Sequence, residues 1–290
     1  MKKIVLSFIC GAMAAVCLIG CSKVNDVVVE PSSDDNEVVL WVDDFNVSVD
    51  TKVTAVTSVP SSLYWCSTTG TLGDTSEKAA WVEKTTTSVS VTSNKINTGH
   101  YQTASPTSYN YYVSSAAITA PASGTAGSIT ISVPDNTKDI VCGKTGGNNT
   151  TAPSVALGHI FARTGTLTMN TQSGYTISGV SWKISGGGTK GTYNITSGAW
   201  NVDSSSKLTN TALTSSSDLY LAPGSYTISC TYTLAKGEYS KQFTKSATVT
   251  LEAGKINNIT GTASGGNASE IVLSVTVTDW VSKTLEPTFS

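Results

Sequence analysis

Hydrophobic and polar residues alternate along most of this chain in short runs, and clusters of Gly, Ser, Asn and Asp separate the runs. Alternation with a period of two is the pattern of a β-strand that buries one face, whereas an amphipathic helix repeats about every 3.6 residues. We therefore predict an all-β protein built as β-sandwiches. The predicted strands are residues 38–49, 63–66, 80–82, 99–103, 109–115, 128–133, 139–142, 155–161, 166–170, 175–184, 191–195, 219–221, 225–234, 246–251, 257–262 and 271–280.

The last of these strands alternates most clearly. Its hydrophobic positions Ile271, Leu273, Val275 and Val277 face one side, and Ser or Thr occupies positions 274, 276 and 278. Burying four such side chains contributes about 6–12 kcal/mol before entropic costs. That is enough to hold the strand in a hydrophobic groove, whether the groove belongs to its own domain or to another molecule.

The first twenty residues predict export. Two lysines precede an apolar run at residues 4–19, which is too short for the roughly 20 residues of a membrane-spanning helix and is typical of a secretory signal peptide. The run ends in Leu18-Ile19-Gly20-Cys21, which resembles a bacterial lipobox, where the cysteine is acylated and becomes the new N-terminus. Two acyl chains would anchor the mature protein to a membrane. The alternative is an ordinary signal peptide followed by Cys21 by chance.

Breaks in the pattern divide the chain into segments. Residues 21–37 are polar and acidic and predict a tether. The Gly- and Asn-rich stretch 143–154 is the strongest internal break, so we expect one β-sandwich domain over residues 38–150 and a second over residues 151–290. Charged residues make up 13% of the chain and the net charge is −2, without the basic stripe that binds phosphates. Nucleic acid is therefore not expected as a partner.

Candidate catalytic chemistry is sparse. Neither His100 nor His159 has a carboxylate or cysteine at metal-ligand spacing, and no Gly-x-Ser-x-Gly turn is present. We expect no enzyme activity, no catalytic residue, no metal and no cofactor. Beyond the signal and Cys21, three cysteines remain. Cys230 lies on the hydrophobic face of its strand and is expected in the core, whereas an oxidising compartment would allow a Cys66–Cys142 bridge.

Several weak motifs occur in a distinctive order. They are Tyr109-Asn-Tyr-Tyr-Val113, Ile129-Thr-Ile-Ser-Val-Pro134, Asp139-Ile-Val-Cys142, the segment from Val155 to Arg163, Gly191-Thr-Tyr with Gly198-Ala-Trp200, Leu221-Ala-Pro-Gly224, Leu251-Glu-Ala-Gly-Lys255 and Val275-Thr-Val-Thr-Asp-Trp280. This succession, together with the lipobox, resembles the fimbrillin family, the lipoprotein subunits of pili on Bacteroidales cells. His159 and Arg163 match a segment that has a structural role in that family.

The resemblance implies two transthyretin-like β-sandwich domains and a surface-exposed lipoprotein of the outer membrane. Other pilus subunits would be its partners, in a homo- or heteropolymer that serves adhesion or biofilm formation. In this family a protease removes the N-terminal strand, and the C-terminal strand of a neighbour fills the groove. Main-chain pairing at an open sheet edge and alternate side-chain pockets agree with this mechanism, and a head-to-tail contact propagates into a filament.

Two segments fit the strand-exchange roles. The strand containing Val38, Leu40 and Val42 would be lost, and the strand from Ile271 to Val277 would be the donor. For each, an ordinary place in its own sheet is the alternative.

One feature departs from the family pattern. Well-studied members are cut after an arginine, but Arg163 is the only arginine in this chain and lies in mid-domain. Cleavage would need another specificity, such as after Lys52, or would not happen. An uncut subunit would remain lipidated as an anchor, an accessory protein or a free surface lipoprotein.

A second hypothesis is a surface lipoprotein that binds glycans or host ligands as a monomer, because the β-sandwich fold does not fix function. It requires two or three aromatic side chains exposed together on one face. The candidate residues are Trp65, Trp81, Trp182 and Trp200.

Overall fold

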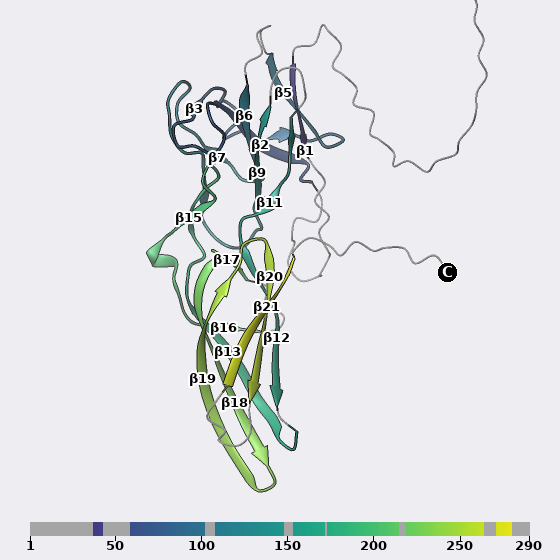
Figure 1. Ribbon diagram of the computed structural model, residues 1–290, viewed down its shortest axis with the longest axis vertical. Helices are drawn as coiled ribbons and strands as arrows, with labels where there is room; N and C mark the ends of the chain where they lie inside the picture. The colour runs from purple at the N-terminus through teal and green to yellow at the C-terminus, as the bar shows by residue number, and fades with distance from the viewer. Residues whose placement is uncertain are drawn as a thin grey trace, which may run out of the picture. The chain divides into compact units, whose positions relative to one another are not determined.

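The computed structural model describes residues 37–42, 59–101, 108–147, 153–171, 173–214, 219–263 and 271–279, with side chains described for all of them except Glu37, Tyr101 and residues 271–279. Strands and one short 3-10 helix, Ser204–Ser206, are the regular elements of these residues (Figure 1). The all-β fold class predicted from the sequence is confirmed. None of the helical structure in these ranges is long and apolar enough to cross a membrane.

Two sheets contain mainly the first half of the chain. In the three-stranded sheet, β1 lies between β10 and β5, parallel to β10 and antiparallel to β5. The second sheet has the order β11-β9-β6-β2-β3, and β4 also pairs with β2. The strands are β1 (Glu37–Val42), β2 (Ser62–Thr69), β3 (Lys78–Ala79), β4 (Val89–Ser90), β5 (Lys95–Tyr101), β6 (Tyr109–Ser114), β9 (Val141–Gly147), β10 (Ser154–Val155) and β11 (Gly158–His159).

Three four-stranded sheets contain the remaining strands. Their orders are β17-β12-β20-β21, β16-β13-β18-β19 and β15-β14-β8-β7, and only the pairing of β12 with β20 is parallel among them. The strands are β7 (Ile118–Thr119), β8 (Thr130–Val133), β12 (Ala162–Thr171), β13 (Thr176–Gly186), β14 (Gly191–Asn194), β15 (Ala199–Val202), β16 (Leu208–Leu213), β17 (Tyr220–Leu221), β18 (Gly224–Lys236), β19 (Tyr239–Leu251), β20 (Lys255–Ala263) and β21 (Ile271–Asp279).

The buried side chains of these strands form three hydrophobic clusters. The first, here called the β1 cluster, consists of Val38, Leu40, Val42, Leu63, Trp65, Ile96, Tyr111, Val113, Val141, Val155 and Leu157. A second cluster combines residues of β6, β8 and β9 with Ile160, Phe161 and Tyr220. The third contains the inward face of β18, where Tyr226, Ile228, Cys230, Tyr232 and Leu234 are buried in strict alternation. The predicted core position of Cys230 is confirmed.

The glycine-rich stretch at 143–154 differs from the expected connection. Residues 143–147 continue β9 and pair with β6 as far as Gly147. A side chain at Gly143 would collide with the carbonyl oxygen of Ala156, which lies 2.1 Å from the position of a Cβ, and one at Gly147 would meet Pro153 at 2.8 Å. These glycines therefore permit close packing rather than flexibility. The domain boundary at 150/151 remains a prediction.

Two of the strands predicted from the sequence, at residues 80–82 and 155–161, were wrong. Residues 80–82 bond to β2 only through Ser67 and then turn away. The predicted strand at 155–161 is interrupted, because the chain leaves β10 after Val155, pairs briefly with β9 through β11, and enters β12 at Ala162. Its large apolar residues are buried, but Val155 and Leu157 lie in the β1 cluster and Ile160 and Phe161 in the second cluster.

Cys66, Cys142 and Cys230 are free and buried. Cys66 lies on β2 and Cys142 on β9, with β6 between them. Two strand spacings are about 9.5 Å, beyond the roughly 7 Å that a disulfide tolerates between Cα atoms. The sheet order therefore opposes the bridge that the sequence left open.

We predict that these three thiols resist modification in the folded protein. Burial raises the pKa of Cys142 to about 12 and of Cys230 to about 11, and burial together with Glu77 raises that of Cys66 further. Iodoacetamide at about pH 8 should label them at least about tenfold more slowly than in urea. Mass spectrometric peptide mapping would measure this, and a disulfide-linked Cys66–Cys142 peptide would contradict it.

The same burial predicts loss of stability in alkali. Burial also raises the pKa of Tyr193 and of Tyr226 to about 12. Because the folded chain favours the neutral thiols and phenols, their contribution is complete below about pH 8.5 and declines as the pH rises toward about 12. Urea unfolding at a series of pH values should show a free energy of unfolding that falls above about pH 9. A constant value up to about pH 11 would contradict this.

Candidate strand-exchange site

Strand β1 is central in its sheet and buries one face completely. Val38, Leu40 and Val42 have exposed fractions of 7%, 0% and 2% and belong to the β1 cluster, whereas Val39 and Trp41 on the other face are half-buried. Burial of three such side chains contributes about 5–9 kcal/mol before entropic costs. Of the predicted strand 38–49, only residues 38–42 lie within the described residues, and their role in strand exchange remains a prediction.

Hydrogen bonds hold β1 on both sides. The backbone N–H of Trp41 donates to Pro153 O at 2.9 Å, beside β10, and that of Val42 donates to Asn94 O at 2.8 Å, beside β5. The hydroxyl of Thr98, which is 2% exposed, donates to Val38 O at 2.7 Å. On the outer face the ammonium of Lys95 lies 4.1 Å from the centre of the Trp41 ring.

Without β1, the remaining β1 cluster would form the floor of an open groove. Leu63, Trp65, Ile96, Tyr111 and Val155 would lose apolar neighbours, and β5 and β10 would each expose an unpaired edge. Such an edge is a template for another strand. A groove of this kind offers both main-chain pairing and alternate side-chain pockets.

The C-terminal strand β21 occupies a sheet edge. It pairs antiparallel with β20 along its length, from Lys255 opposite Asp279 to Ala263 opposite Ile271. The backbone of Ile271, Leu273, Val275 and Val277 is thus placed, but their side chains lie outside the described part. An edge strand has one ladder to break before it can leave, whereas a central strand has two.

The long edge strand β19 carries a different signal. Lys241 and Lys245 are paired with Leu234 and Cys230, which face the core, so both lysines stand at inward positions of this edge. Inward-pointing charges on an edge strand discourage pairing with another chain. This edge is therefore a poor site for intermolecular contacts.

The aromatic residues considered for glycan binding do not form an exposed platform. Trp65 and Trp182 are buried, with exposed fractions of 0% and 6%. Trp200 is half-buried, packs on Phe161 and donates from Nε1 to Ile160 O at 3.0 Å. Trp81 is half-buried and two other rings already stack on it. The hypothesis of a glycan-binding monomer therefore loses the sequence feature on which it depended.

Both histidines have carboxylate partners that were not predicted from the sequence. His159 Nδ1 lies 2.5 Å from Asp139 Oδ2 in the interior, and His100 forms an ion pair with Glu83. No local motif could have found them, because strand pairing of β11 with β9 brings residue 159 beside residues 139–141. Within the described residues no group of three or more His, Cys, Asp or Glu side chains could hold a metal ion.

A buried carboxylate also escaped the sequence analysis. Glu77 is 1% exposed and accepts hydrogen bonds from the hydroxyls of Thr68 and Tyr112 and from the backbone N–H of Gly73. Three donors satisfy the buried acid, as burial requires. The carboxylate thereby fixes the loop between β2 and β3 against β6, a structural role.

Cys21, the tether up to residue 36 and Lys52 lie outside the described residues. Lipidation at Cys21 and cleavage near Lys52 therefore remain predictions.

Comparison with known proteins supports the fold. No protein-family model matches the sequence, and no curated protein matches it. Among solved structures, a candidate cell adhesion protein from Parabacteroides distasonis has a TM-score of 0.52 at 10% identity, covering 84% of this chain and 96% of that one. Another from the same species has a TM-score of 0.50 at 9% identity, covering 84% and 99%. At these identities the likeness shows that the chain has the fold of these proteins.

A fimbrilin from Porphyromonas gingivalis is also similar, at 10% identity and with 86% of this chain and 98% of that one covered. Its TM-score of 0.47 is too low to carry an argument.

We predict that Leu40 contributes much of the energy that keeps β1 in place. Leu40→Ala should lower the free energy of unfolding by about 2–4 kcal/mol, because the fully buried side chain would leave a cavity. The matched control Val39→Ala, on the half-buried face of the same strand, should cost less than about 1 kcal/mol. Urea denaturation measures both. Equal losses for the two variants would show that the buried face does not anchor the strand.

Proposed function

We propose that this protein is a structural subunit of a surface pilus assembled by β-strand exchange, in the service of adhesion or biofilm formation. The observation that carries the proposal is the combination of a central strand near the start of the described chain, whose departure would open a hydrophobic groove, with an edge strand near its end. The fold shared with candidate cell adhesion proteins supports it.

In the proposed cycle the chain is exported, acylated at Cys21 and held at the outer membrane, exposed at the cell surface. Removal of β1 empties the groove, and residues 271–279 of a neighbouring subunit fill it. The donor positions Ile271, Leu273, Val275 and Val277 repeat every second residue, as Val38, Leu40 and Val42 do, so they match the same row of pockets. Because the contact is head-to-tail, it continues along a fibre of identical or different subunits.

Processing cannot use the arginine. Arg163 is 2% exposed, and its backbone is paired with Tyr220 and Ile256 in the middle of a sheet. A cut that separates β1 from the rest of the chain has to fall between β1 and β2, within residues 43–61, for example after Lys52. A subunit that escapes cleavage would stay acylated and act as the anchor or as an accessory protein.

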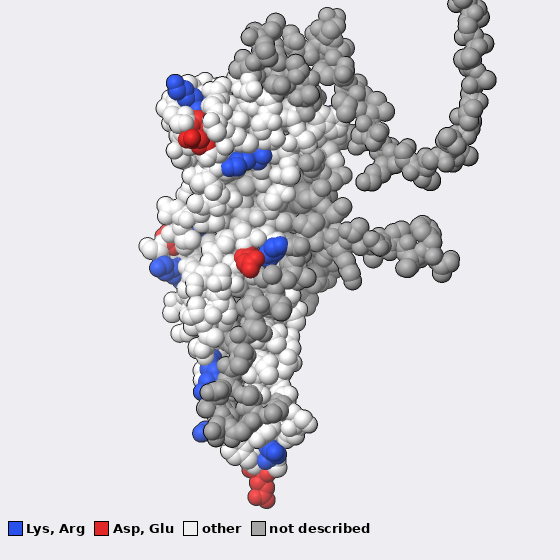
Figure 2. All heavy atoms as spheres, viewed as in Figure 1, with Lys and Arg blue, Asp and Glu red and all other residues white. Residues whose placement is uncertain are grey.

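The charge distribution of the chain favours a protein partner over a polyanion. The face shown in Figure 2 carries scattered basic and acidic side chains without a continuous patch of one sign among the described residues. The net charge of the chain is −2. Subunit association would therefore rely on strand pairing and apolar pockets, and should depend only weakly on salt.

The test places a specific protease site within residues 43–58 of the full chain. Cutting the folded protein should convert monomers into fibres visible by electron microscopy, because the cut allows β1 to be replaced. The matched control is the same cut chain carrying Val275→Asp and Val277→Asp, which places charges in the donor strand and should remain monomeric. Cut protein that stays monomeric while β1 is released would contradict the assembly role.

A further inference from the structure

Strand β5 has an unusual dependence on the strand that the proposed function removes. Among the described strands β5 pairs only with β1, apart from a single bridge between Lys95 and Thr92 in the preceding turn. When β1 leaves, β5 loses its ladder, yet an incoming strand needs β5 in place as an edge. Among the described residues, side-chain contacts are what can hold β5 in place at that stage.

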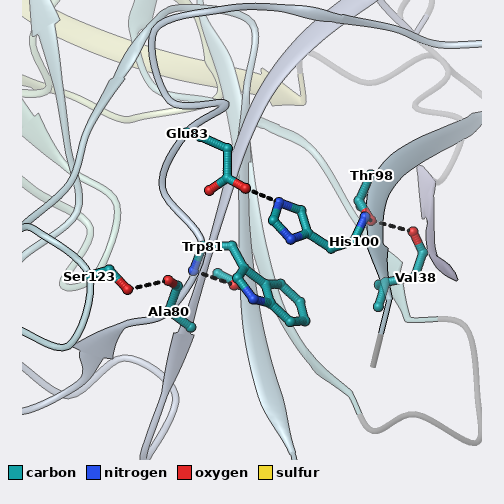
Figure 3. A network of polar contacts seen from close by, with 8 residues as sticks. Val38, Ala80, Trp81, Glu83, Thr98, His100 and Ser123 are labelled. Carbon is teal, nitrogen blue, oxygen red and sulfur yellow. Dashed lines mark hydrogen bonds and ion pairs between the residues drawn. The ribbon is translucent and has the colours of Figure 1, made fainter. Parts of the chain in front are cut away.

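The side chain of His100, near the end of β5, makes contacts that do not involve β1. Its ring stacks on Trp81 with a centroid distance of 4.8 Å and an interplanar angle of 16°, and it meets Trp65 edge-on at 5.5 Å and 82°. Its Nε2 forms an ion pair with Glu83 (Figure 3). Tyr109 stacks on Trp81 at 4.5 Å and extends the group.

The residues that receive His100 border the β1 cluster, but they also have contacts that do not involve β1. Trp65 is fully buried in β2. The backbone N–H of Trp81 donates to the hydroxyl of Ser67 at 3.1 Å, and the N–H of Ser67 donates back to Trp81 O at 2.9 Å. The hydroxyl of Ser123 donates to Ala80 O at 2.6 Å (Figure 3). This support ties the 80–83 segment to β2 and to the 121–126 loop.

Thr98 connects β1 with the backbone of His100. The hydroxyl of Thr98 donates to Val38 O of β1 at 2.7 Å and accepts from the backbone N–H of His100 at 3.2 Å. Thr98 is 2% exposed, so departure of β1 would leave its hydroxyl without that acceptor in the interior. A new strand that supplies a carbonyl at the Val38 position would satisfy it again.

We propose that Trp81, Glu83 and His100 form a clamp that holds β5 in position while the groove is empty. This inference rests on the proposed function and names the positioning residues of the same site. The clamp keeps the groove preorganised, so the incoming strand pairs with a fixed edge and does not first have to order β5. Loss of the clamp reduces the fraction of emptied subunits that can bind, and the apparent affinity for a strand falls by that fraction.

The test uses the full chain with the engineered protease site. The protein is immobilised on a solid support and cut at that site. It is then washed with increasing concentrations of urea until mass spectrometry shows that β1 has been released. Trypsin cleavage after Lys95, followed by peptide mapping, reports whether β5 is held. A synthetic peptide of residues 36–43 then refills the groove. The variants are His100→Ala and Glu83→Gln, with Phe243→Ala as a matched control that removes a ring stacked on Tyr232 elsewhere.

In the uncut chain we expect slow cleavage after Lys95 in every variant. In the emptied chain His100→Ala should be cleaved about tenfold faster than the unmodified protein and need about tenfold more peptide for protection. Glu83→Gln should show a smaller change in the same direction, and Phe243→Ala none.

Equal cleavage of emptied His100→Ala and unmodified protein would overturn the clamp. Equally fast cleavage of His100→Ala before the cut would also overturn it, because that result indicates a general packing role. A β1 fragment that leaves only when the whole protein unfolds would defeat the proposed function and the clamp together. If the residue 36–43 peptide binds as expected but a residue 271–290 peptide does not, the donor assignment fails and the clamp stands.

Discussion

The backbone ladder of β1 is the interaction on which the first sheet depends. β1 lies between β5 and β10, and within the described sheet neither of these strands has another partner. In the chain, β5 comes just before β6 of the second sheet, and β10 comes just after β9. The buried face of β1 then completes a cluster with residues of β2, β6 and β9. A six-residue strand therefore stabilises segments far apart in the sequence. Removal of β1 would expose the apolar floor of this cluster and the edges of β5 and β10.

Open edges are not equivalent in this fold. β19 has thirteen residues and a long free edge, but two inward lysines oppose its use. β21 has a free edge as well and is held by one ladder. The two edges of the described sheets therefore differ: the β19 edge carries lysines, whereas β21 is held by one described ladder.

Alternation predicted the strands with one buried face and one polar face. β18 follows it along its length, and its buried residues Tyr226, Ile228, Cys230, Tyr232 and Leu234 lie in the strand predicted at 225–234. The strand and linker predictions that failed share a cause. Alternation and glycine content are local features of the sequence, whereas residues far apart in the chain decide which strands pair. Gly143 and Gly147 indicated a linker, but they are glycines because Ala156 and Pro153 pack against β9.

The site itself could be predicted only in part. The pairing of Thr98 with Val38 spans sixty residues, and that of His100 with Glu83 depends on how β5 returns beside β2. The four tryptophans looked equivalent in the sequence. Their different burial follows from which face of which strand they occupy, and the alternation around Trp81 was too short to assign a face.

The hydroxyl of Thr98 recognises a main-chain carbonyl, and every amino acid carries one. This contact therefore sets the axial position of a strand without selecting its sequence, and selection is left to the pockets that Val38, Leu40 and Val42 occupy. If the proposed strand exchange takes place, such a groove would accept donor strands with different aliphatic residues, so subunits of different sequence could follow one another in a fibre.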